Sequence, residues 1–275
     1  MTLSSIIKAI TPPFLFKQFR KLLTHRKRYK TYSEALIASS SSKGYEDPYL
    51  VRTIFEETKE YQNSLKEEKE IFIDQTIILT LLPFSLIKNK ETINILDIGG
   101  ACGIHFYPIK KIFNEVHNLK WTIVETEALT RISKPFESED LKFFSNVDEA
   151  AKTLKDIDLI IASGVIQYCE NPKDILTKIT RLGAEFVLIT RLSLTTSKEE
   201  IITVQRSLLS QNSFERLPNG TIDRVIKYPH TTISESDFNA IIQEEYKIKL
   251  RFEDQSGILK NNSDELGYGL LLQKK

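Results

Sequence analysis

The sequence predicts an α/β fold, in which a doubly wound, mostly parallel seven-stranded sheet follows a helical N-terminal extension. Two observations lead to this prediction. From Thr92 onward, short apolar runs alternate with helical patterns, as is typical of strands buried on both faces of a parallel sheet. Roughly the first 90 residues show only helical periodicity. We therefore expect a helical extension over residues 1–90 and an α/β domain over residues 91–275.

The composition is that of an ordinary globular protein. Of the 275 residues, 41% are hydrophobic and 27% are charged, with a formal net charge of +1. Cys102 and Cys169 lie far apart, which predicts neither a disulfide framework nor a zinc site. We expect no metal, since no cluster of Asp and His has ligand spacing. No apolar run reaches the ~18 residues of a membrane span, and the N-terminus lacks the charge order of a signal peptide, so we expect a cytoplasmic protein.

A strongly basic segment, Lys17 to Lys30, contains apolar residues at helical spacing. We expect a basic amphipathic helix with three alternative roles. It contacts an anionic membrane surface peripherally, on the inner face of the membrane, it approaches phosphate-bearing substrates, or it packs on its own domain with a solvated basic face. Aromatic interleaving and a recognisable nucleic-acid-binding module are absent, so we expect no nucleic-acid partner.

Two further helices are expected in the N-terminal extension. Asp47 and Pro48 mark the start of the first, as cap and first-turn residue. A second helical pattern covers residues 67–82, and Pro83 interrupts the apolar run in which it lies.

The strands of the α/β domain are apolar runs of four to six residues. The expected parallel strands are residues 93–98, 120–125, 141–144, 158–163 and 185–190. A helix follows the fourth of them, with Asn171 as its cap, Pro172 at its first position and Gly183 after its end.

The C-terminal part is expected to complete the sheet. After a long irregular insertion over residues 192–233, the pattern predicts a capped helix over residues 234–245. Residues 246–254 and 266–274 then read as two strands, an antiparallel pair that closes the sheet.

The first strand leads into a glycine-rich turn in the stretch "NILDIGGACGIHFY", Asn94 to Tyr107. Glycines let a backbone approach a ligand closely, and the helix that follows offers unpaired N–H groups. The turn differs from the dinucleotide pattern GxGxxG and lacks the GK[ST] of a P-loop. Asp97, two positions before the first glycine, would repel a pyrophosphate but suits a cationic or neutral ligand.

Glu125 ends the next strand and is expected at the same crevice, because ligands of open α/β sheets bind beyond the carboxyl ends of the strands. A carboxylate at this position can accept hydrogen bonds from both hydroxyls of a ribose. The glycine turn and Glu125 together predict a binding site for a nucleoside.

Four stretches, "LDIGGACG", "WTIVE", "IIASGVIQY" and "FVLITR", resemble the successive motifs of class I S-adenosylmethionine-dependent methyltransferases, which have a Rossmann-like fold. More narrowly, "GYEDP", "SGVIQYCENP", "TVQ" and "YPHTTIS" resemble a group of bacterial methyltransferases often encoded among surface-polysaccharide genes. The resemblance extends from about Gly44 to the C-terminus. It implies S-adenosylmethionine as the cofactor.

The resemblance also implies a set of cofactor-binding residues. The glycine turn would form the backbone wall around the methionine part and ribose, while Asp97 would orient the turn or meet the cationic amino group. Glu125 would hold the ribose hydroxyls. Two residues after the third strand would contact adenine, and two at the end of the fourth would lie beside the sulfonium. The implied residues are Asp97, Gly99, Gly100, Ala101, Gly103, Glu125, Ser145, Asn146, Ser163 and Gly164.

Methyl transfer to a hydroxyl group benefits from a general base. His230, in the insertion, is the first candidate, and His105, after the glycine turn, is the second. The insertion and the helical extension would cover the acceptor side. Expected acceptor-site residues are Gln167, Tyr168, Arg191 and Gln205.

The expected reaction is the O-methylation of a saccharide or another surface-glycan precursor. Two alternatives remain at this point. The acceptor is a different small molecule or is lipid-linked, or the chain is a catalytically silent cofactor-binding partner of a polysaccharide assembly complex.

Overall fold

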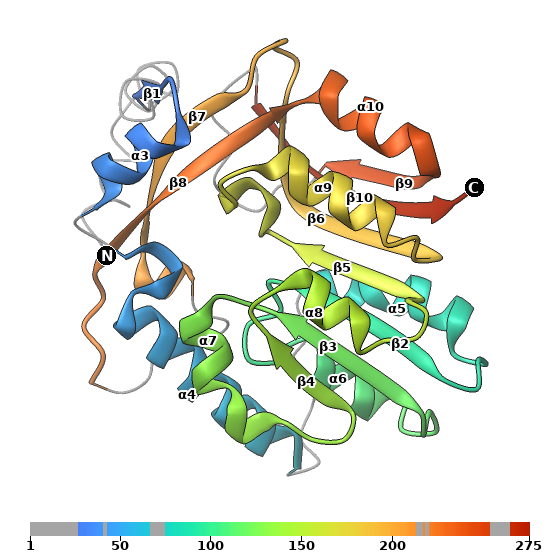
Figure 1. The fold of residues 1–275 in the computed structure, drawn as a ribbon. Helices are drawn as coiled ribbons and strands as arrows, with labels where there is room; N and C mark the ends of the chain where they lie inside the picture. The colour runs from blue at the N-terminus through green and yellow to red at the C-terminus, as the bar shows by residue number, and fades with distance from the viewer. Residues whose placement is uncertain (1–26, 41–42, 67–74, 213–216, 218–219, 254–264) are drawn as a thin grey trace, which may run out of the picture.

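A computed structural model describes residues 27–40, 43–66, 75–212, 217, 220–253 and 265–275 (Figure 1). The helices are α3 (Tyr32–Ser39), α4 (Pro48–Lys66), α5 (Gln75–Ile87), α6 (Phe106–Ile112), α7 (Glu127–Ile132), α8 (Val147–Lys152), α9 (Pro172–Arg181) and α10 (Glu235–Glu245). The strands are β1 (Arg28–Tyr29), β2 (Ile93–Ile98), β3 (Leu119–Val124), β4 (Leu141–Phe144), β5 (Leu159–Ser163), β6 (Phe186–Thr195), β7 (Ile201–Leu208), β8 (Val225–Ser234), β9 (Tyr246–Glu253) and β10 (Glu265–Lys274).

The central sheet is mostly parallel, which confirms the predicted fold class. Strands β4, β3, β2, β5 and β6 are neighbours in this order and are all parallel. Strand β10 pairs antiparallel with β6, and β9 pairs antiparallel with β10, as predicted for the C-terminal pair. Strands β8, β7 and β1 extend these seven strands to an open ten-stranded sheet. Because β2 to β6 are parallel, their carboxyl ends lie at the same edge of the sheet.

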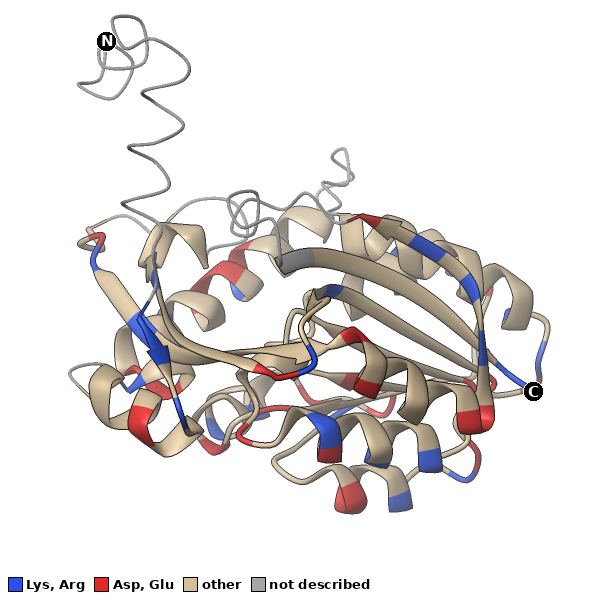
Figure 2. Ribbon diagram, turned by 90° about the horizontal axis from the view of Figure 1, so that it is seen from above, with Lys and Arg blue, Asp and Glu red and all other residues tan. Residues whose placement is uncertain are grey.

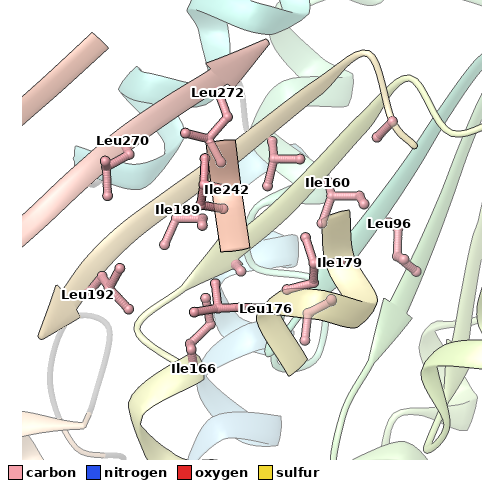
Figure 3. Packing of buried hydrophobic residues seen from close by; sticks show 14 of the residues in the cluster. Leu96, Ile160, Ile166, Leu176, Ile179, Ile189, Leu192, Ile242, Leu270 and Leu272 are labelled. Carbon is pink, nitrogen blue, oxygen red and sulfur yellow. The ribbon is translucent and has the colours of Figure 1, made fainter. Parts of the chain in front are cut away.

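Two apolar clusters, one for each face of the sheet, form the core. Helices α8, α9 and α10 cover one face, and α5 and α6 lie behind the other (Figure 1). On the first face, Leu176 and Ile179 of α9 and Ile242 of α10 pack on sheet residues such as Ile160 and Ile189 (Figure 3). Burial on both faces is the reason why these strands read as continuous apolar runs.

The prediction of irregular structure for residues 192–233 is wrong over much of the segment, because it contains extended strands. Strand β6 runs on to Thr195, and β7 pairs antiparallel with β8 over eight residue pairs. Burial alternates along β7, with Thr203, Gln205 and Ser207 buried and Arg206 exposed. This period of two is a strand signal that the polar composition of the segment obscures. The β7–β8 hairpin extends from the carboxyl edge of the central sheet (Figure 1).

Most of the predicted basic helix is not covered by the described residues, and its last residues are not helical. Residues 17–26 lie outside the described residues, while Arg28 and Tyr29 form strand β1, which pairs antiparallel with β7. A new helix, α3, then begins after Thr31, whose hydroxyl accepts a hydrogen bond from the backbone N–H of Glu34 at 3.2 Å. Helix α3 packs on β7 and β8.

The second predicted helix differs in its bounds. Residues 67–74 lie outside the described residues, and α5 continues through Pro83 to Ile87. Pro83 lacks an N–H group and so removes one helical hydrogen bond. Burial of Ile77, Phe84 and Ile87 on the sheet offsets that loss. None of the helices in the described part of the chain is long and apolar enough to cross a membrane.

The predicted helix ends are confirmed in position, but only some of the predicted capping hydrogen bonds are formed. The Asp47 carboxylate accepts a hydrogen bond from the N–H of Tyr49 at 3.0 Å and so caps α4. Asn171 stands at the N-cap of α9, but its side chain makes no capping hydrogen bond there. Gly183 follows the end of α9 with φ +69°, the left-handed conformation that favours glycine.

Candidate functional site

The glycine-rich turn after β2 lies at the carboxyl edge of the sheet. Gly99 and Gly103 adopt φ values of +75° and +101°, and Ala101 between them has φ 51°. A Cβ atom on Gly99 would stand 2.7 Å from Cβ of Val165, in the loop after β5. Glycine is therefore required at position 99 both for its conformation and for the close approach of two loops.

Asp97 is fully buried beneath this turn. Its Oδ2 accepts a hydrogen bond from the indole N–H of Trp121 at 3.2 Å and lies 3.1 Å from Nδ1 of His105. A Cβ atom on Gly100 would stand 2.5 Å from the same oxygen. Asp97 Oδ1 has no hydrogen-bond partner among the described residues. These contacts join β2, β3 and the turn, and they place His105 beside Asp97 with only 3% of its surface exposed.

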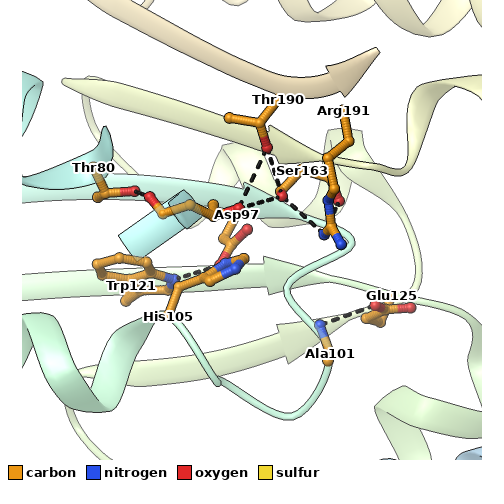
Figure 4. Close-up of polar contacts among 10 residues, drawn as sticks. Thr80, Asp97, Ala101, His105, Trp121, Glu125, Ser163, Thr190 and Arg191 are labelled. Atoms are coloured by element: carbon orange, nitrogen blue, oxygen red, sulfur yellow. Dashed lines mark hydrogen bonds and ion pairs between the residues drawn. The ribbon is translucent and has the colours of Figure 1, made fainter. Parts of the chain in front are cut away.

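Glu125 reaches the turn from the end of β3. Its Oε1 accepts a hydrogen bond from the backbone N–H of Ala101 at 3.0 Å (Figure 4). Its Oε2 accepts one from the backbone N–H of Thr126, also at 3.0 Å. Burial, opposed by these two hydrogen bonds, raises the pKa of Glu125 to about 7. Each oxygen retains a lone pair for a further donor.

The residues expected near adenine lie at the end of β4. Ser145 and Asn146 are both exposed. The Asn146 side chain caps α8, since its Oδ1 accepts hydrogen bonds from the N–H groups of Asp148 and Glu149 at 2.8 and 3.2 Å. The side-chain oxygen of Asn146 is thus already used by the protein itself.

Ser163, at the end of β5, belongs to a buried hydroxyl cluster that the sequence analysis did not identify. Its Oγ lies 2.9 Å from Oγ1 of Thr76 on α5 and 2.7 Å from Oγ1 of Thr190 on β6. The guanidinium of Arg191 donates to the carbonyl oxygen and hydroxyl of Ser163 at 3.3 and 3.0 Å (Figure 4). A Cβ atom on Gly164 would stand 2.9 Å from Nε of Arg191, so the absence of a side chain at position 164 leaves room for the guanidinium.

The β7–β8 hairpin meets the loop after β5 through a second polar network. Tyr168 donates its hydroxyl proton to Oε1 of Gln205 at 3.2 Å, and Nε2 of Gln205 donates to the hydroxyl of Tyr228 at 3.1 Å. Burial raises the pKa of Tyr168 to about 12. Gln167 is buried beside this network and donates to the backbone carbonyl of Arg191 at 2.9 Å. All four predicted acceptor residues therefore lie close together, with Gln205 contributed by β7.

His230 lies on β8 within this region. Its Nε2 is 3.0 Å from Oγ of Ser193, and its ring meets that of Tyr168 edge to face with 5.5 Å between centroids. Only 2% of the residue is exposed. His230 therefore stands next to the predicted acceptor residues, whereas His105 lies with Asp97 under the glycine turn.

Several residues of the site escaped the sequence analysis. The ring of Tyr45 packs on those of Tyr168 and Tyr228, with centroids 5.3 and 4.9 Å away. Tyr45, Tyr228 and Thr190 do fall within the "GYEDP", "YPHTTIS" and "FVLITR" stretches, but Thr76 and Ser193 lie in no motif. Within the described ranges, no three His, Cys, Asp or Glu residues gather in a group that could hold a metal ion.

Comparisons with known proteins leave the function open. No protein-family model and no curated protein matches the chain. Among solved structures, the N-terminal domain of EvdMO1 with SAH bound matches with a TM-score of 0.49 and 10% sequence identity, over 79% of this chain and 97% of that one.

Two further solved structures are methyltransferases. Magnesium protoporphyrin IX methyltransferase from Synechocystis PCC 6803 with bound SAM has a TM-score of 0.44 and 10% identity, over 73% of this chain and 79% of that one. The O-methyltransferase from a trans-AT PKS multienzyme of Brevibacillus brevis, in complex with S-adenosyl-L-homocysteine, has a TM-score of 0.48 and 12% identity, over 71% of each chain. At these low values the similarities do not identify the function of this chain.

Proposed function

We propose that the chain is an S-adenosylmethionine-dependent methyltransferase that methylates a hydroxyl group of a saccharide or surface-glycan precursor. The observation that carries the proposal is the contact between Glu125 and the glycine-rich turn, in which Oε1 of Glu125 accepts the N–H of Ala101 at 3.0 Å. A carboxylate that can accept hydrogen bonds from two ribose hydroxyls thus lies beside a glycine-rich turn, whose backbone can approach a ligand closely.

The residues present fit this cofactor in three respects. The oxygens of Glu125 retain lone pairs for hydroxyl donors, and Asp97 contributes negative charge next to a turn that would meet a cationic ligand. The loops after β2 and β5 also approach each other at glycines, where a side chain would fill the space. Gly99, Gly100, Ala101 and Gly103 would hold the methionine part and ribose, and Ser145 and Asn146 would border the adenine.

The acceptor side is formed by the β7–β8 hairpin and the N-terminal extension. Residue pairs opposed on the hairpin, such as Gln205 with Tyr228 and Thr203 with His230, are buried and mostly polar. Amide and hydroxyl groups of this kind suit the hydroxyls of a sugar. Gln167, Tyr168 and Arg191 extend the same wall to the ends of β5 and β6, next to Ser163 and Gly164.

For catalysis, the chain has to orient the acceptor against the cofactor and to remove the proton of the acceptor hydroxyl. When bound, S-adenosylmethionine supplies a methyl group activated by the positive charge on sulfur. Aligning two reactants can contribute roughly 7–11 kcal/mol to rate enhancement. His230 takes the proton of the acceptor hydroxyl, and Ser193 fixes the orientation of its ring through the contact at Nε2. His105 orients the glycine turn through Asp97.

The test is the release of S-adenosylhomocysteine by the purified protein in the presence of S-adenosylmethionine and a panel of sugars and nucleotide sugars. Turnover that depends on a sugar, with mass spectrometry locating the methyl group on oxygen, supports the proposal. Cofactor binding without turnover on any sugar would contradict the saccharide part. Absence of cofactor binding would contradict the proposal as a whole.

A further inference from the structure

The proposed acceptor wall, which the β7–β8 hairpin and the loop after β5 form, contains polar side chains that mostly bind one another. Gln205 accepts a hydrogen bond from the hydroxyl of Tyr168 at 3.2 Å and donates to that of Tyr228 at 3.1 Å. The Tyr228 hydroxyl also lies 2.7 Å from Oγ of Ser207. Because these contacts use both ends of the Gln205 amide, they hold the wall together, and a ligand has to be recognised by other groups.

Two buried polar atoms of this wall have no hydrogen-bond partner in the part of the chain that the structure describes. They are Oε1 of Gln167, in the loop after β5, and Oγ1 of Thr203, on β7. Only 3% of Gln167 and 2% of Thr203 are exposed. Thr203 stands opposite His230 in the register of the hairpin, and Gln167 precedes Tyr168, whose ring meets that of His230. Both atoms thus lie in the neighbourhood of His230, the proposed base.

The amide of Gln167 is held in one orientation. Its Nε2 donates to the backbone carbonyl of Arg191 at 2.9 Å, and since a carbonyl oxygen only accepts, this contact identifies the other end of the amide as the oxygen. A buried acceptor without a donor costs free energy in the unbound protein. A hydroxyl group supplies the missing donor, whereas an ether or a carboxylate does not.

The side chain of Thr203 lies on the same face of the hairpin as His230, because directly opposed residues of an antiparallel pair share a face. A hydroxyl both donates and accepts, so that of Thr203 suits a hydroxyl of a ligand. Thr231 provides a comparison within the same hairpin. Its buried Oγ1 also lacks a partner among the described residues, but Thr231 stands opposite Ile202 and so lies on the other face, since successive strand residues alternate.

We propose that Gln167 and Thr203 determine the acceptor specificity by binding hydroxyls other than the one that is methylated, an inference that rests on the function proposed above. Gln167 accepts a hydrogen bond from one hydroxyl, and Thr203 exchanges a hydrogen bond with another. The substrate class is thus a polyol that presents free hydroxyls beside the reacting one. A position that is already methylated is rejected at Gln167, because an ether has no proton to donate.

The two atoms are closed to solvent, so the acceptor reaches them only after a covering segment moves. The N-terminal extension is such a segment. Tyr45 packs on the rings of Tyr168 and Tyr228, with centroids 5.3 and 4.9 Å away. Tyr32 donates to the backbone carbonyl of Tyr168 at 3.0 Å. Acceptor binding therefore displaces contacts between the extension and the wall.

Calorimetry on the protein saturated with S-adenosylhomocysteine tests the inference, with the methyl glycosides of glucose, galactose and mannose as probes. We expect the wild type to bind at least one of them. Gln167→Met and Thr203→Val should each weaken the binding of that glycoside by about threefold to tenfold, which corresponds to one neutral hydrogen bond. Thr231→Val, the matched control on the opposite face, should leave its affinity unchanged.

Melting temperatures separate ligand recognition from a structural role. Thr203→Val removes a hydroxyl that the unbound fold does not use, so its melting temperature should equal or exceed that of the wild type. Thr180→Val removes a buried hydroxyl that donates to the Thr177 carbonyl at 2.9 Å, and should melt lower. A fall in Thr203→Val like that in Thr180→Val would overturn the inference.

Unchanged glycoside affinity in both folded variants would overturn the inference as well. So would a wild type that binds S-adenosylhomocysteine but none of the glycosides, a result that leaves the proposed cofactor site intact. A wild type that does not bind S-adenosylhomocysteine would overturn the proposed function too.

Discussion

At the scale of single residues, the position of Glu125 at the end of a strand gives its carboxylate two properties, hydrogen bonds from backbone N–H groups and burial. Its carboxylate oxygens accept backbone N–H groups at 3.0 Å, which favours the charged form, and its burial disfavours that form more strongly. A bound ribose would add hydroxyl donors and so favour the charged form further. The pKa of Glu125 should therefore fall when the cofactor binds.

Glu125 should make the stability of the free protein depend on pH. Its pKa is raised from 4.5 in the reference state to about 7 in the fold. As the pH falls from 7 to 4.5, the folded protein takes up a proton before the unfolded chain does, so the free energy of unfolding rises, by at most about 3 kcal/mol. Thermal unfolding of the wild type and Glu125→Gln between these pH values measures the difference. The control is Glu127→Gln, because Glu127 is exposed and lies two residues away. If stability depends on pH in the same way in the wild type and in Glu125→Gln, the raised pKa of Glu125 is refuted.

His230 should affect turnover and not cofactor affinity. If it removes the acceptor proton, His230→Ala should lower kcat by roughly 10²–10⁴ while the affinity for S-adenosylmethionine stays almost the same. His230→Gln keeps a hydrogen-bonding group near Ser193 but no base, and should restore little activity. Steady-state kinetics and calorimetry separate the two effects, with the exposed His117→Ala as control. Full activity of folded His230→Ala would remove it from the mechanism.

At the scale of elements, burial decides which parts could be predicted. Strands β2 and β5 lie in the middle of the sheet and are mostly apolar, so their runs were evident. The β7–β8 hairpin was not recognised because its buried face carries polar residues, and because Pro229 interrupts a segment that would otherwise read as a strand. The register of β8 with β7 depends on cross-strand partners that lie far apart in the sequence.

Separation in the sequence also decides which parts of the site could be predicted. The glycine turn and Glu125 are local features of adjacent strands, and they meet as expected. The contact of Tyr45 with Tyr228, and that of Thr76 with Ser163, join segments separated by many residues. No local spacing predicts such contacts, and they arise only when α5 and the hairpin pack on the end of the sheet.

The glycine turn allows a paired test at neighbouring positions. In Gly100→Ala the new Cβ atom would approach Asp97 Oδ2 to 2.5 Å, so the turn must shift. The expected cost is about 1–3 kcal/mol of stability, together with a loss of cofactor affinity. Ala101→Gly relieves a left-handed φ of 51° and should keep stability within about 1 kcal/mol and retain binding. Denaturant unfolding and calorimetry measure both, and equal behaviour of the two variants would contradict the described geometry.

At the scale of the whole molecule, a surface with several basic residues lies beside the proposed acceptor wall. Lys and Arg residues colour the strands at the left end of Figure 2, where β1 and β7 lie. Lys27, Arg28 and Lys30 are exposed there, and Leu36 and Ile37 on α3 are 52% and 72% exposed. Basic and aliphatic side chains together suit an anionic membrane surface. Tyr32, between them, donates to the backbone carbonyl of Tyr168 at 3.0 Å and so connects this surface to the proposed acceptor wall.

We propose a peripheral membrane contact through this surface and the basic segment that precedes it. The full chain should bind vesicles that contain phosphatidylglycerol at ~20 mM salt and be released at ~500 mM, because screening shortens the range of the attraction. Neutral phosphatidylcholine vesicles should not bind. Replacing Lys27, Arg28 and Lys30 by Gln should weaken sedimentation with the vesicles. Absence of binding at low salt would favour the alternative of a basic segment packed on its own domain.

The central claim, that the glycine turn and Glu125 bind S-adenosylmethionine, is tested most directly by one calorimetric titration of S-adenosylhomocysteine into the wild type and Glu125→Gln at pH ~8, above the raised pKa of Glu125. We predict one site per chain in the wild type and an affinity lower by about tenfold to a hundredfold in Glu125→Gln, from the loss of charge-assisted hydrogen bonds to the ribose. Equal affinities in the two folded proteins, or no binding to the wild type, would contradict the claim.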